Sequence, residues 1–345
     1  MSGPAVPVEP MRIREMARRE ESEPRFLGGH ALCAGCGIPI VVRTILNSIP
    51  TPVVVVNATG CLEVATTRYP TTAWNVPWLH VAFENAAASM SGIEAASRAL
   101  VRRGAIASEQ EITFVVFAGD GGTYDIGLQS LSGALERGHR LMYVCYDNEA
   151  YMNTGIQRSG ATPLAARTST TPLGVSSLGN MHRRKDLTAI VAAHRVPYVA
   201  QASVSDFQDL SRKARRAALT PGPAFLNVLS SCPLGWGTEP RDTVRVARMA
   251  VETGYWPLFE VINQHYRINY EPDPRLPVTR WLSSQGRFRH LEHDHGDIIE
   301  QIQAEVDEQW RRLQERSAAD AHYFAAEIGA VPPPRDATSP GPRMR

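Results

Sequence analysis

Two polar residues, Asp120 and Asn148, each follow a run of apolar residues that is typical of a strand buried on both faces. The two runs cover residues 112–118 and 141–146, and residues 127–138 between them have the apolar spacing of a helix. The strands of such a unit lie parallel, so both polar residues are expected at the same edge of one sheet, where ligands of open α/β folds bind. Carboxylate and amide oxygens are ligands for Mg²⁺, and the glycines around the aspartate allow backbone N–H groups to approach a diphosphate.

The spacing of Asp120 and Asn148 resembles the thiamine-diphosphate motif, which begins with Gly-Asp-Gly and ends with Asn or a similar residue after one strand–helix–strand crossover. The Gly-Asp-Gly triplet alone would be typical of an ordinary turn in which Asp120 caps a helix, and the second half of the motif favours the cofactor site. A dinucleotide site is disfavoured, because Gly119 and Gly121 are followed by no third glycine at the required offset. Gly119, Asp120, Gly121, Gly122 and Asn148 are therefore predicted to bind thiamine diphosphate.

Four cysteines form the second candidate site. Cys33 and Cys36 are a Cys-x-x-Cys pair in a glycine-rich loop, and Cys61 and Cys232 each follow a predicted strand. Four thiolates suit either structural Zn²⁺ or an iron–sulfur cluster. Zinc ribbons usually present two close pairs, whereas one pair joining two distant cysteines is more often compatible with a cluster. A thioredoxin-like redox pair would explain neither Cys61 nor Cys232, and Cys145, between apolar neighbours, is expected in the core.

The elements that position these residues alternate between strands and helices. This alternation predicts an α/β fold, a doubly wound parallel sheet of the type that binds the diphosphate of thiamine diphosphate, with a mostly helical C-terminal extension. The predicted strands are 53–57, 112–118, 141–146, 198–201 and 224–229, and the predicted helices are 39–48, 84–103, 127–138, 186–194 and 207–219.

The chain divides into four predicted segments. Residues 1–24 are charged and contain several prolines, which predicts a mobile arm, and residues 25–236 form the α/β domain. Residues 237–330 are predicted to form a helical extension that wraps around the domain. Residues 331–345 are rich in proline and are expected to be disordered.

Composition narrows the class of protein. The 345 residues include 36 Lys and Arg against 35 Asp and Glu, a net charge of +1, which gives no indication of a nucleic acid or an anionic membrane as partner. The longest apolar runs are far shorter than the roughly 18 residues of a membrane helix. The charged N-terminal region lacks an apolar signal core, which predicts a cytoplasmic protein.

Taken together, the motifs resemble those of the β subunit of 2-oxoacid:ferredoxin oxidoreductases, and within them the pyruvate type. The matching stretches occur in the order typical of that family and are residues 29–37, 59–61, 119–127, 147–155, 231–236 and 250–260. The resemblance implies the diphosphate-binding half of a thiamine site with one [4Fe–4S] cluster beside it.

Residue roles follow from this resemblance. It implies that Asp120, the Asn148 side chain and the Ala150 carbonyl hold Mg²⁺, and that Asn153 lies near the thiazolium ring and the substrate. It also implies a cluster bound by four residues, Cys33, Cys36, Cys61 and Cys232.

The same resemblance implies coenzyme A-dependent oxidative decarboxylation of pyruvate to acetyl-CoA and CO₂, or the reverse, with electrons passing through the cluster to ferredoxin. Branched-chain, aryl and 2-oxoglutarate substrates are alternatives. So are a non-catalytic, zinc-stapled chain that binds partners and a thiamine-dependent decarboxylase with structural cysteines.

Partners are expected because no second series of alternating strands and helices follows Cys232. The family pattern implies a hetero-oligomer in which an α subunit with a pyrimidine-binding domain supplies the glutamate that activates the cofactor. A ferredoxin-like subunit and ferredoxin are the implied electron acceptors.

Several weaker candidates remain. The histidine-rich stretch 290–295 is a possible metal site, although it borders a helix start. Arg183, Arg184 and Lys185 are predicted to lie on solvated helix faces or at subunit contacts. Arg287 is predicted to form surface ion pairs, with a coenzyme A phosphate as the alternative partner.

Overall fold

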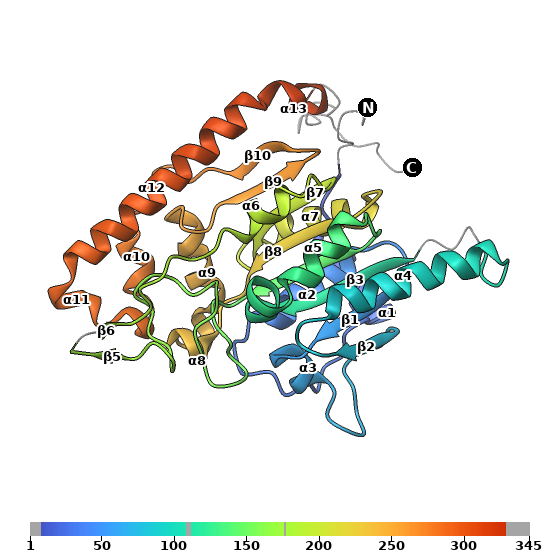
Figure 1. The fold of residues 1–345 in the computed structure, drawn as a ribbon, viewed down its shortest axis with the longest axis horizontal. Coiled ribbons are helices and arrows are strands. Elements are labelled where there is room, and N and C mark those ends of the chain that lie inside the picture. Colours follow the sequence, from blue (N-terminus) through green and yellow to red (C-terminus); the bar gives the residue numbers. More distant parts are fainter. Residues whose placement is uncertain (1–7, 108–111, 176, 329–345) are drawn as a thin grey trace, which may run out of the picture.

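A mostly parallel sheet of β-branched and aromatic strands forms the centre of the molecule. The computed structural model describes residues 8–107, 112–175 and 177–328. The eight strands have the order β10-β9-β7-β8-β4-β3-β1-β2 (Figure 1). Their bounds are β1 Val53–Ala58, β2 Trp78–Val81, β3 Thr113–Gly119, β4 Met142–Asp147, β7 Tyr198–Ser203, β8 Ala224–Leu229, β9 Leu258–Ile262 and β10 His265–Tyr270.

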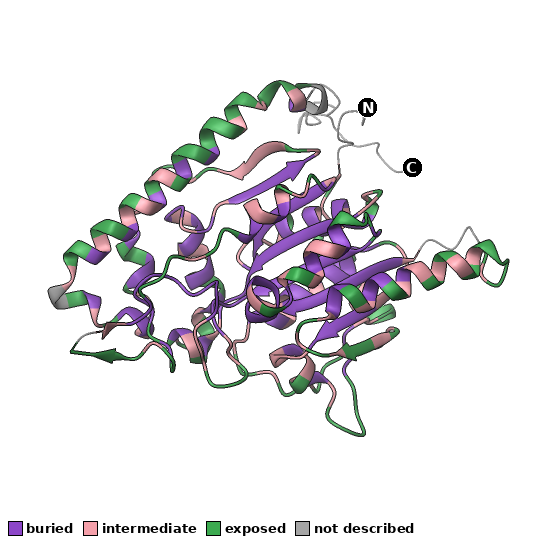
Figure 2. Cartoon of the chain, viewed as in Figure 1, coloured by how far each residue is buried: buried purple, intermediate pink, exposed green. Residues whose placement is uncertain are grey.

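Alternate residues of each strand enter two hydrophobic cores, one on each face of the sheet. Val115 and Phe117 of β3 belong to one core, whereas Val116 and Ala118 belong to the other, as the period of a strand requires. The first core contains residues of α2 (Ile38–Ser48), α7 (Phe207–Leu219) and α9 (Thr243–Glu252), and the second contains residues of α4 (Ala86–Arg102), α5 (Leu128–Glu136) and α6 (Leu187–Ala192). The predicted doubly wound α/β fold is therefore confirmed, with the sheet buried between helices (Figure 2).

The N-terminal segment differs from the prediction of a mobile arm over residues 1–24. Helix α1 (Ile13–Ser22) buries Met16 and packs against α2. The Arg19 guanidinium donates a hydrogen bond of 3.0 Å to the Asn47 carbonyl. The prolines of this segment lie before and after α1, so they bound the helix and do not interrupt it.

The C-terminal extension is mostly helical, as predicted, but it also adds two strands to the central sheet. Strand β9 pairs antiparallel with β7, and β10 pairs antiparallel with β9. The turn between β9 and β10 consists of Asn263 and Gln264, both with positive φ (48° and 72°), which is the conformation of a type I′ hairpin turn. Glycine is the usual second residue of that turn, so Asn-Gln is a weak signal for a hairpin.

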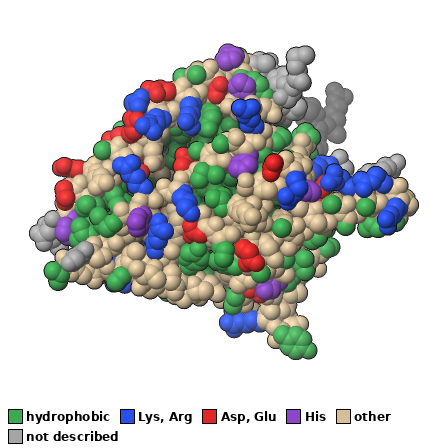
Figure 3. Space-filling model, viewed as in Figure 1, with side chains coloured by type: hydrophobic (Ala, Val, Ile, Leu, Met, Phe, Trp, Pro, Cys, Tyr) green, Lys and Arg blue, Asp and Glu red, His purple; other side chains and the backbone are tan. Residues whose placement is uncertain are grey.

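The remaining extension folds over the edge of the sheet. It contains α10 (Thr279–Leu282), α11 (Leu291–Asp294), α12 (Gly296–Ala319) and α13 (Ala321–Ile328), and α12 lies along β10 (Figure 1). Ile298, Ile302, Val306, Trp310 and Leu313 form its buried face, as their spacing predicted. Acidic and basic side chains are interspersed along the exposed face (Figure 3). The predicted disordered tail, residues 331–345, lies outside the described residues.

Within the part of the chain that the structure describes, no helix combines the length and the apolar composition needed to cross a membrane.

Candidate active site

The carboxyl ends of β1, β3 and β4 enclose a cavity of about 430 Å³. The chain passes from β1 to β2 on one side and then crosses to β3 on the other, so the winding of the sheet reverses here. Ligands of open α/β sheets bind at such a reversal. The lining residues include those predicted to bind the cofactor, namely Gly119, Asp120, Gly121, Gly122, Asn148, Ala150 and Asn153.

Three potential oxygen ligands converge in this cavity. One end of the Asn148 side-chain amide lies 3.0 Å from the Ala150 carbonyl oxygen and 2.9 Å from Asp120 Oδ1, and in the orientation that satisfies both oxygens this end is the NH₂ group. Turned over, the same amide places its oxygen against these two oxygens, an arrangement that a cation between them would stabilise. The residues predicted to hold Mg²⁺ are therefore brought together by the fold.

The Asp120 carboxylate is buried beside another carboxylate. Its Oδ2 accepts a hydrogen bond from the Ser159 hydroxyl (2.5 Å), and its Oδ1 accepts one from the Asn148 backbone N–H (3.3 Å). Burial, followed by the charge of Asp147, raises the pKa of Asp120 well above its usual range. A divalent cation fits this position because it would supply the positive charge that favours the ionised form.

The first turn after β3 requires glycine at two positions. Residues Gly121–Ile126 form a π-helical turn, a feature that is frequent at functional sites. A side chain at Gly121 would overlap the Tyr151 ring, and one at Gly127 would overlap the Gly122 carbonyl. The Tyr151 hydroxyl donates to Asp125 Oδ2 (2.9 Å) and so fixes its ring against the turn.

The rim of the cavity combines residues that the sequence had indicated with others that it had not. Asn153 lines the cavity and is exposed. Thr59, Gly60, Phe83 and Glu84 also line it. Thr59 and Gly60 belong to the matching stretch 59–61, whereas Phe83 and Glu84 had no such signal.

Three of the predicted cluster cysteines, Cys36, Cys61 and Cys232, pack at the edge of one core, and Cys33 is exposed nearby. Burial, together with the charges of the other three thiols, raises the pKa of Cys36 to about 12. The thiols are thus close enough to interact. Cys145 is fully buried in β4, as predicted for a core residue.

The four thiols interact through their charges, and one of them also accepts a backbone hydrogen bond. Among the residues that the structure describes, no three Cys, His, Asp or Glu side chains surround a point suitable for a single metal ion. The Gly235 N–H donates to Cys232 Sγ (3.4 Å), a type of hydrogen bond that tunes iron–sulfur clusters. Four cysteine thiols are a donor set that either an iron–sulfur cluster or structural zinc can use.

Cys61 belongs to both candidate sites. It lines the 430 Å³ cavity, and burial, the thiols of Cys232 and Cys33, and then the Asp120 carboxylate raise the pKa of its thiol to about 12. The Tyr146 hydroxyl lines the same cavity, is buried, and has no hydrogen-bond partner among the described residues. A bound group in this cavity would provide that partner.

Two arginines lie elsewhere than predicted. Arg184 is mostly buried and pairs with Asp147 and Glu149, and Arg287 is buried and pairs with Glu149. The predictions of a solvated face for Arg184 and of a surface ion pair for Arg287 are wrong, because each has a buried carboxylate partner far away in the sequence. Arg183 is exposed, as predicted.

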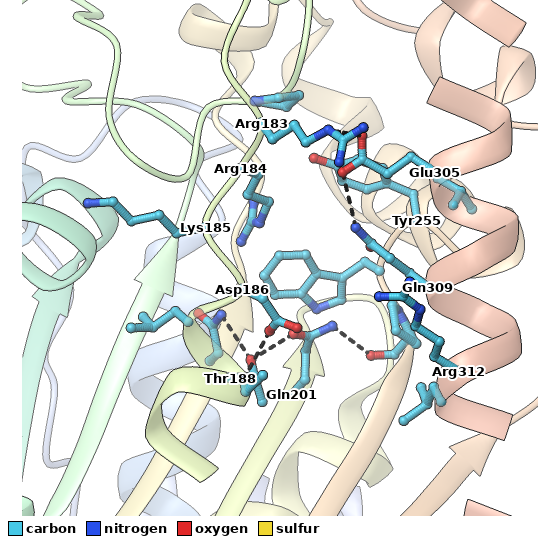
Figure 4. A pocket seen from close by; sticks show the side chains of 18 of the residues that line it. Arg183, Arg184, Lys185, Asp186, Thr188, Gln201, Tyr255, Glu305, Gln309 and Arg312 are labelled. Atoms are coloured by element: carbon cyan, nitrogen blue, oxygen red, sulfur yellow. Dashed lines mark hydrogen bonds and ion pairs between the residues drawn. The ribbon is translucent and has the colours of Figure 1, made fainter. Parts of the chain in front are cut away.

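A second cavity of about 360 Å³ lies between α12 and the sheet (Figure 4). Arg184 and Tyr255 line it, but Asp120, Asn148 and the four cysteines do not. The convergent oxygens and Cys61 thus belong to the first cavity. In the stretch 290–295, His290 contacts the Leu178 carbonyl (3.1 Å), and no metal site is formed by the side chains described there.

The sequence is similar to known proteins over most of its length. Residues 58–228 match the family model described as thiamine pyrophosphate enzyme, C-terminal TPP binding domain. The pyruvate synthase subunit PorB of Methanocaldococcus jannaschii is 50% identical over 291 residues, which cover 84% of this chain and 97% of the relative. The PorB of Thermotoga maritima is 47% identical over 310 residues, covering 88% of this chain and 96% of the relative.

Two further matches are informative. The ketoisovalerate oxidoreductase subunit VorB of Pyrococcus abyssi is 43% identical over 310 residues, covering 88% of this chain and 98% of the relative. The solved structure of 2-oxoglutarate:ferredoxin oxidoreductase from Magnetococcus marinus matches the fold with a TM-score of 0.50 and 18% identity, over 70% of this chain and 84% of that one. With identities of this size over nearly the full length of the relatives, the chain belongs to the family of 2-oxoacid:ferredoxin oxidoreductase β subunits of the pyruvate synthase type.

Proposed function

We propose that this chain provides the diphosphate-binding and electron-accepting half of an enzyme that oxidatively decarboxylates pyruvate with coenzyme A, or catalyses the reverse reaction. The observation that carries the proposal is the convergence of the three oxygens beside the four thiols, with Cys61 lining the same cavity as Asp120. A thiamine site next to a one-electron acceptor suits the oxidation of a 2-oxoacid.

Each bound group would have its own residues. Asp120, the Asn148 side chain and the Ala150 carbonyl would hold Mg²⁺ and, through it, the diphosphate. A side chain at position 121 would overlap the Tyr151 ring, and the glycine there would allow the backbone to approach the phosphates.

The four cysteines, Cys33, Cys36, Cys61 and Cys232, would hold a [4Fe–4S] cluster. When bound, thiamine diphosphate supplies the electron sink for decarboxylation and the cluster supplies one-electron transfer. Asn153, exposed at the rim, would contact the substrate or the thiazolium ring.

The complete enzyme requires further chains. Among residues 8–107, 112–175 and 177–328 there is one large sheet, and the only other sheet is the two-stranded pair β5 (Leu173–Gly174) and β6 (Ser177–Leu178). A pyrimidine-binding domain of comparable size would therefore come from an α subunit, which would supply the activating glutamate. We infer a hetero-oligomer that also includes a ferredoxin-like subunit and passes electrons to ferredoxin.

The similarity to relatives with different names leaves two candidate 2-oxoacid substrates. The identity of 43% to the ketoisovalerate oxidoreductase subunit equals that to the PorB of Pyrococcus furiosus, so a branched-chain 2-oxoacid is the alternative substrate. The pocket side chains that would separate the two substrates can also come from the α subunit.

Purification of the complex with its co-purifying subunits tests this proposal. We expect the complex to contain iron and sulfide in equal amounts and to bind thiamine diphosphate in a Mg²⁺-dependent manner. It should also reduce an electron acceptor when pyruvate and coenzyme A are supplied. Preferential turnover of 2-oxoisovalerate in a panel of 2-oxoacids would favour the alternative substrate. Zinc without visible absorption, and no turnover of any 2-oxoacid, would instead favour a non-catalytic partner-binding chain.

A further inference from the structure

The turn formed by residues 148–150 carries two of the three converging oxygens, and its middle residue is Glu149. Glu149 has a backbone φ of 71°, in the left-handed region that non-glycine residues occupy at an energetic cost. Its conformation sets the directions of the Asn148 side chain and the Ala150 carbonyl, because these residues flank it. The turn therefore requires interactions that hold Glu149 in this conformation.

The Glu149 carboxylate is fully buried and is bound through both oxygens. Oε1 accepts hydrogen bonds from Arg184 Nη1 (3.0 Å) and from the Tyr255 hydroxyl (2.9 Å), and Oε2 pairs with Arg287 Nη2. The Glu149 backbone N–H also donates to Asp147 Oδ1 (3.1 Å). Two cations and a hydroxyl thus fix the side chain of one residue whose backbone is strained.

Both arginines are themselves held in place. The Arg184 guanidinium lies 4.6 Å from the centre of the Trp256 ring, and that of Arg287 lies 4.4 Å from the centre of the Trp236 ring. The Trp236 indole N–H donates to the Asn148 carbonyl (2.8 Å), which ties Arg287 to the turn a second time. These contacts leave little freedom to the groups that bind the carboxylate.

Glu149 lies between the two cavities. Arg184 and Tyr255 project toward the cavity under α12 (Figure 4), whereas Asn148 and Ala150 line the cavity at the strand ends. Glu149 thus contacts the residues of the cation site from outside the cavity and does not line the cavity itself.

We propose that Glu149 is a positioning residue for the cation site. Its carboxylate, held by Arg184, Arg287 and Tyr255, keeps the Asn148 side chain and the Ala150 carbonyl directed at Asp120 and thereby sets the affinity for Mg²⁺. This inference rests on the proposed function, because it concerns the same site. Residues that orient metal ligands from behind typically change metal affinity by about 10- to 100-fold when they are replaced.

Glu260 provides a matched control. It is also a fully buried carboxylate bound by two arginines and a tyrosine, namely Arg216, Arg267 and Tyr198. It lies on β9 and lines neither cavity. Its replacement disturbs an equivalent buried charge network without touching the 148–150 turn.

The test uses the assembled enzyme complex carrying Glu149→Gln, Tyr255→Phe, Glu260→Gln or Asp120→Ala. The Mg²⁺ concentration for half-maximal binding of thiamine diphosphate is measured by calorimetry, and Mn²⁺ binding is measured by electron paramagnetic resonance. For Glu149→Gln we expect that concentration to rise by about 10- to 100-fold, with turnover restored at saturating Mg²⁺. Tyr255→Phe should give a smaller rise, and Glu260→Gln none.

The outcomes separate the two proposals. Cofactor binding that survives Asp120→Ala would overturn the cation site itself. Loss of binding in Asp120→Ala with unchanged Mg²⁺ dependence in Glu149→Gln would overturn only the positioning role, and so would an equal shift in Glu260→Gln. If Glu149→Gln fails to assemble, Tyr255→Phe decides, because an unchanged Mg²⁺ dependence in that variant contradicts the inference.

Discussion

At the scale of single residues, Asp120 combines two properties that rarely occur together in a structural side chain. It is almost fully buried, and both this burial and the charge of the nearby Asp147 raise its pKa. A buried carboxylate without an adjacent cation is costly, and perturbed carboxylates of this kind cluster at functional sites. This supports a role in binding a cation over a role as a helix cap.

Replacing Asp120 tests this role directly. Asp120→Ala should abolish Mg²⁺-dependent binding of thiamine diphosphate while the fold persists, because the cation that holds the diphosphate would lose the one carboxylate among its three proposed ligands. Calorimetric titration with the cofactor at fixed Mg²⁺ measures the affinity, and circular dichroism checks the fold. Unchanged affinity in this variant would show that the cation binds elsewhere.

The cysteines permit a paired experiment. Cys232→Ser should lose cluster iron, since a serine oxygen is a poorer ligand for the cluster than a thiolate, whereas Cys145→Ser should retain it because Cys145 is buried within β4. Iron and sulfide content and the visible absorption of the purified proteins are the measurements. Equal loss of iron in both variants, or in neither, would contradict the proposed ligands.

At the scale of elements, Glu260 holds the β9–β10 hairpin to the rest of the sheet. It accepts a hydrogen bond from the Tyr198 hydroxyl of β7 (2.9 Å) and pairs with Arg267 of β10 and Arg216 of α7. Burial alone would raise the pKa of Glu260, but the arginines, with Lys213, lower it from 4.5 to about 2. The carboxylate therefore remains charged in the folded protein at pH values where it is protonated in the unfolded chain.

This pKa shift predicts a pH-dependent effect on stability. Because the folded-state pKa lies below the ordinary value, the stabilisation is fully present above about pH 4.5 and is lost as the pH falls toward about 2. Glu260→Gln should lower the free energy of unfolding by about 3 kcal/mol at neutral pH, since it leaves buried arginine charge uncompensated. Denaturant unfolding at neutral and acidic pH measures this difference, and a difference that does not shrink at low pH would contradict the ion-pair explanation.

At the scale of the whole molecule, the described chain provides one large sheet and one cofactor cavity at its edge. Asn153, at the rim of that cavity, is exposed. As far as it is described, to residue 328, the extension after Cys232 completes this sheet through β9 and β10 and does not begin a second one of comparable size. The pyrimidine half of the cofactor therefore lacks a domain within the described residues.

Activity should consequently depend on a second subunit. We expect the isolated chain, reconstituted with thiamine diphosphate, Mg²⁺ and the iron–sulfur cluster, neither to decarboxylate pyruvate nor to reduce viologen. Addition of the subunit with the pyrimidine-binding domain should restore both reactions. Turnover by the isolated chain at a rate near that of the complex would show that the activating glutamate is present in this chain.

The local patterns of the sequence were sufficient to predict five strands of the central domain, β1, β3, β4, β7 and β8, but not the edge strand β2. The composition and period of residues 112–118 and 141–146 predicted buried strands, and the parallel crossover between them required Asp120 and Asn148 to lie at one edge of the sheet. That prediction is confirmed by the distance of 2.9 Å between the Asn148 amide and Asp120. It succeeded because every step depended on residues close together in the chain.

Long-range interactions decided the rest. The burial of Arg184 and Arg287 depends on Glu149, which is 35 and 138 residues away from them in the sequence. The hairpin of β9 and β10 joins the sheet through its pairing with β7, and its Asn263-Gln264 turn lacks the glycine that would have indicated it. An arginine in a sequence carries no sign of whether a buried carboxylate will meet it, since burial of a charge is favourable only with a partner that the tertiary structure supplies.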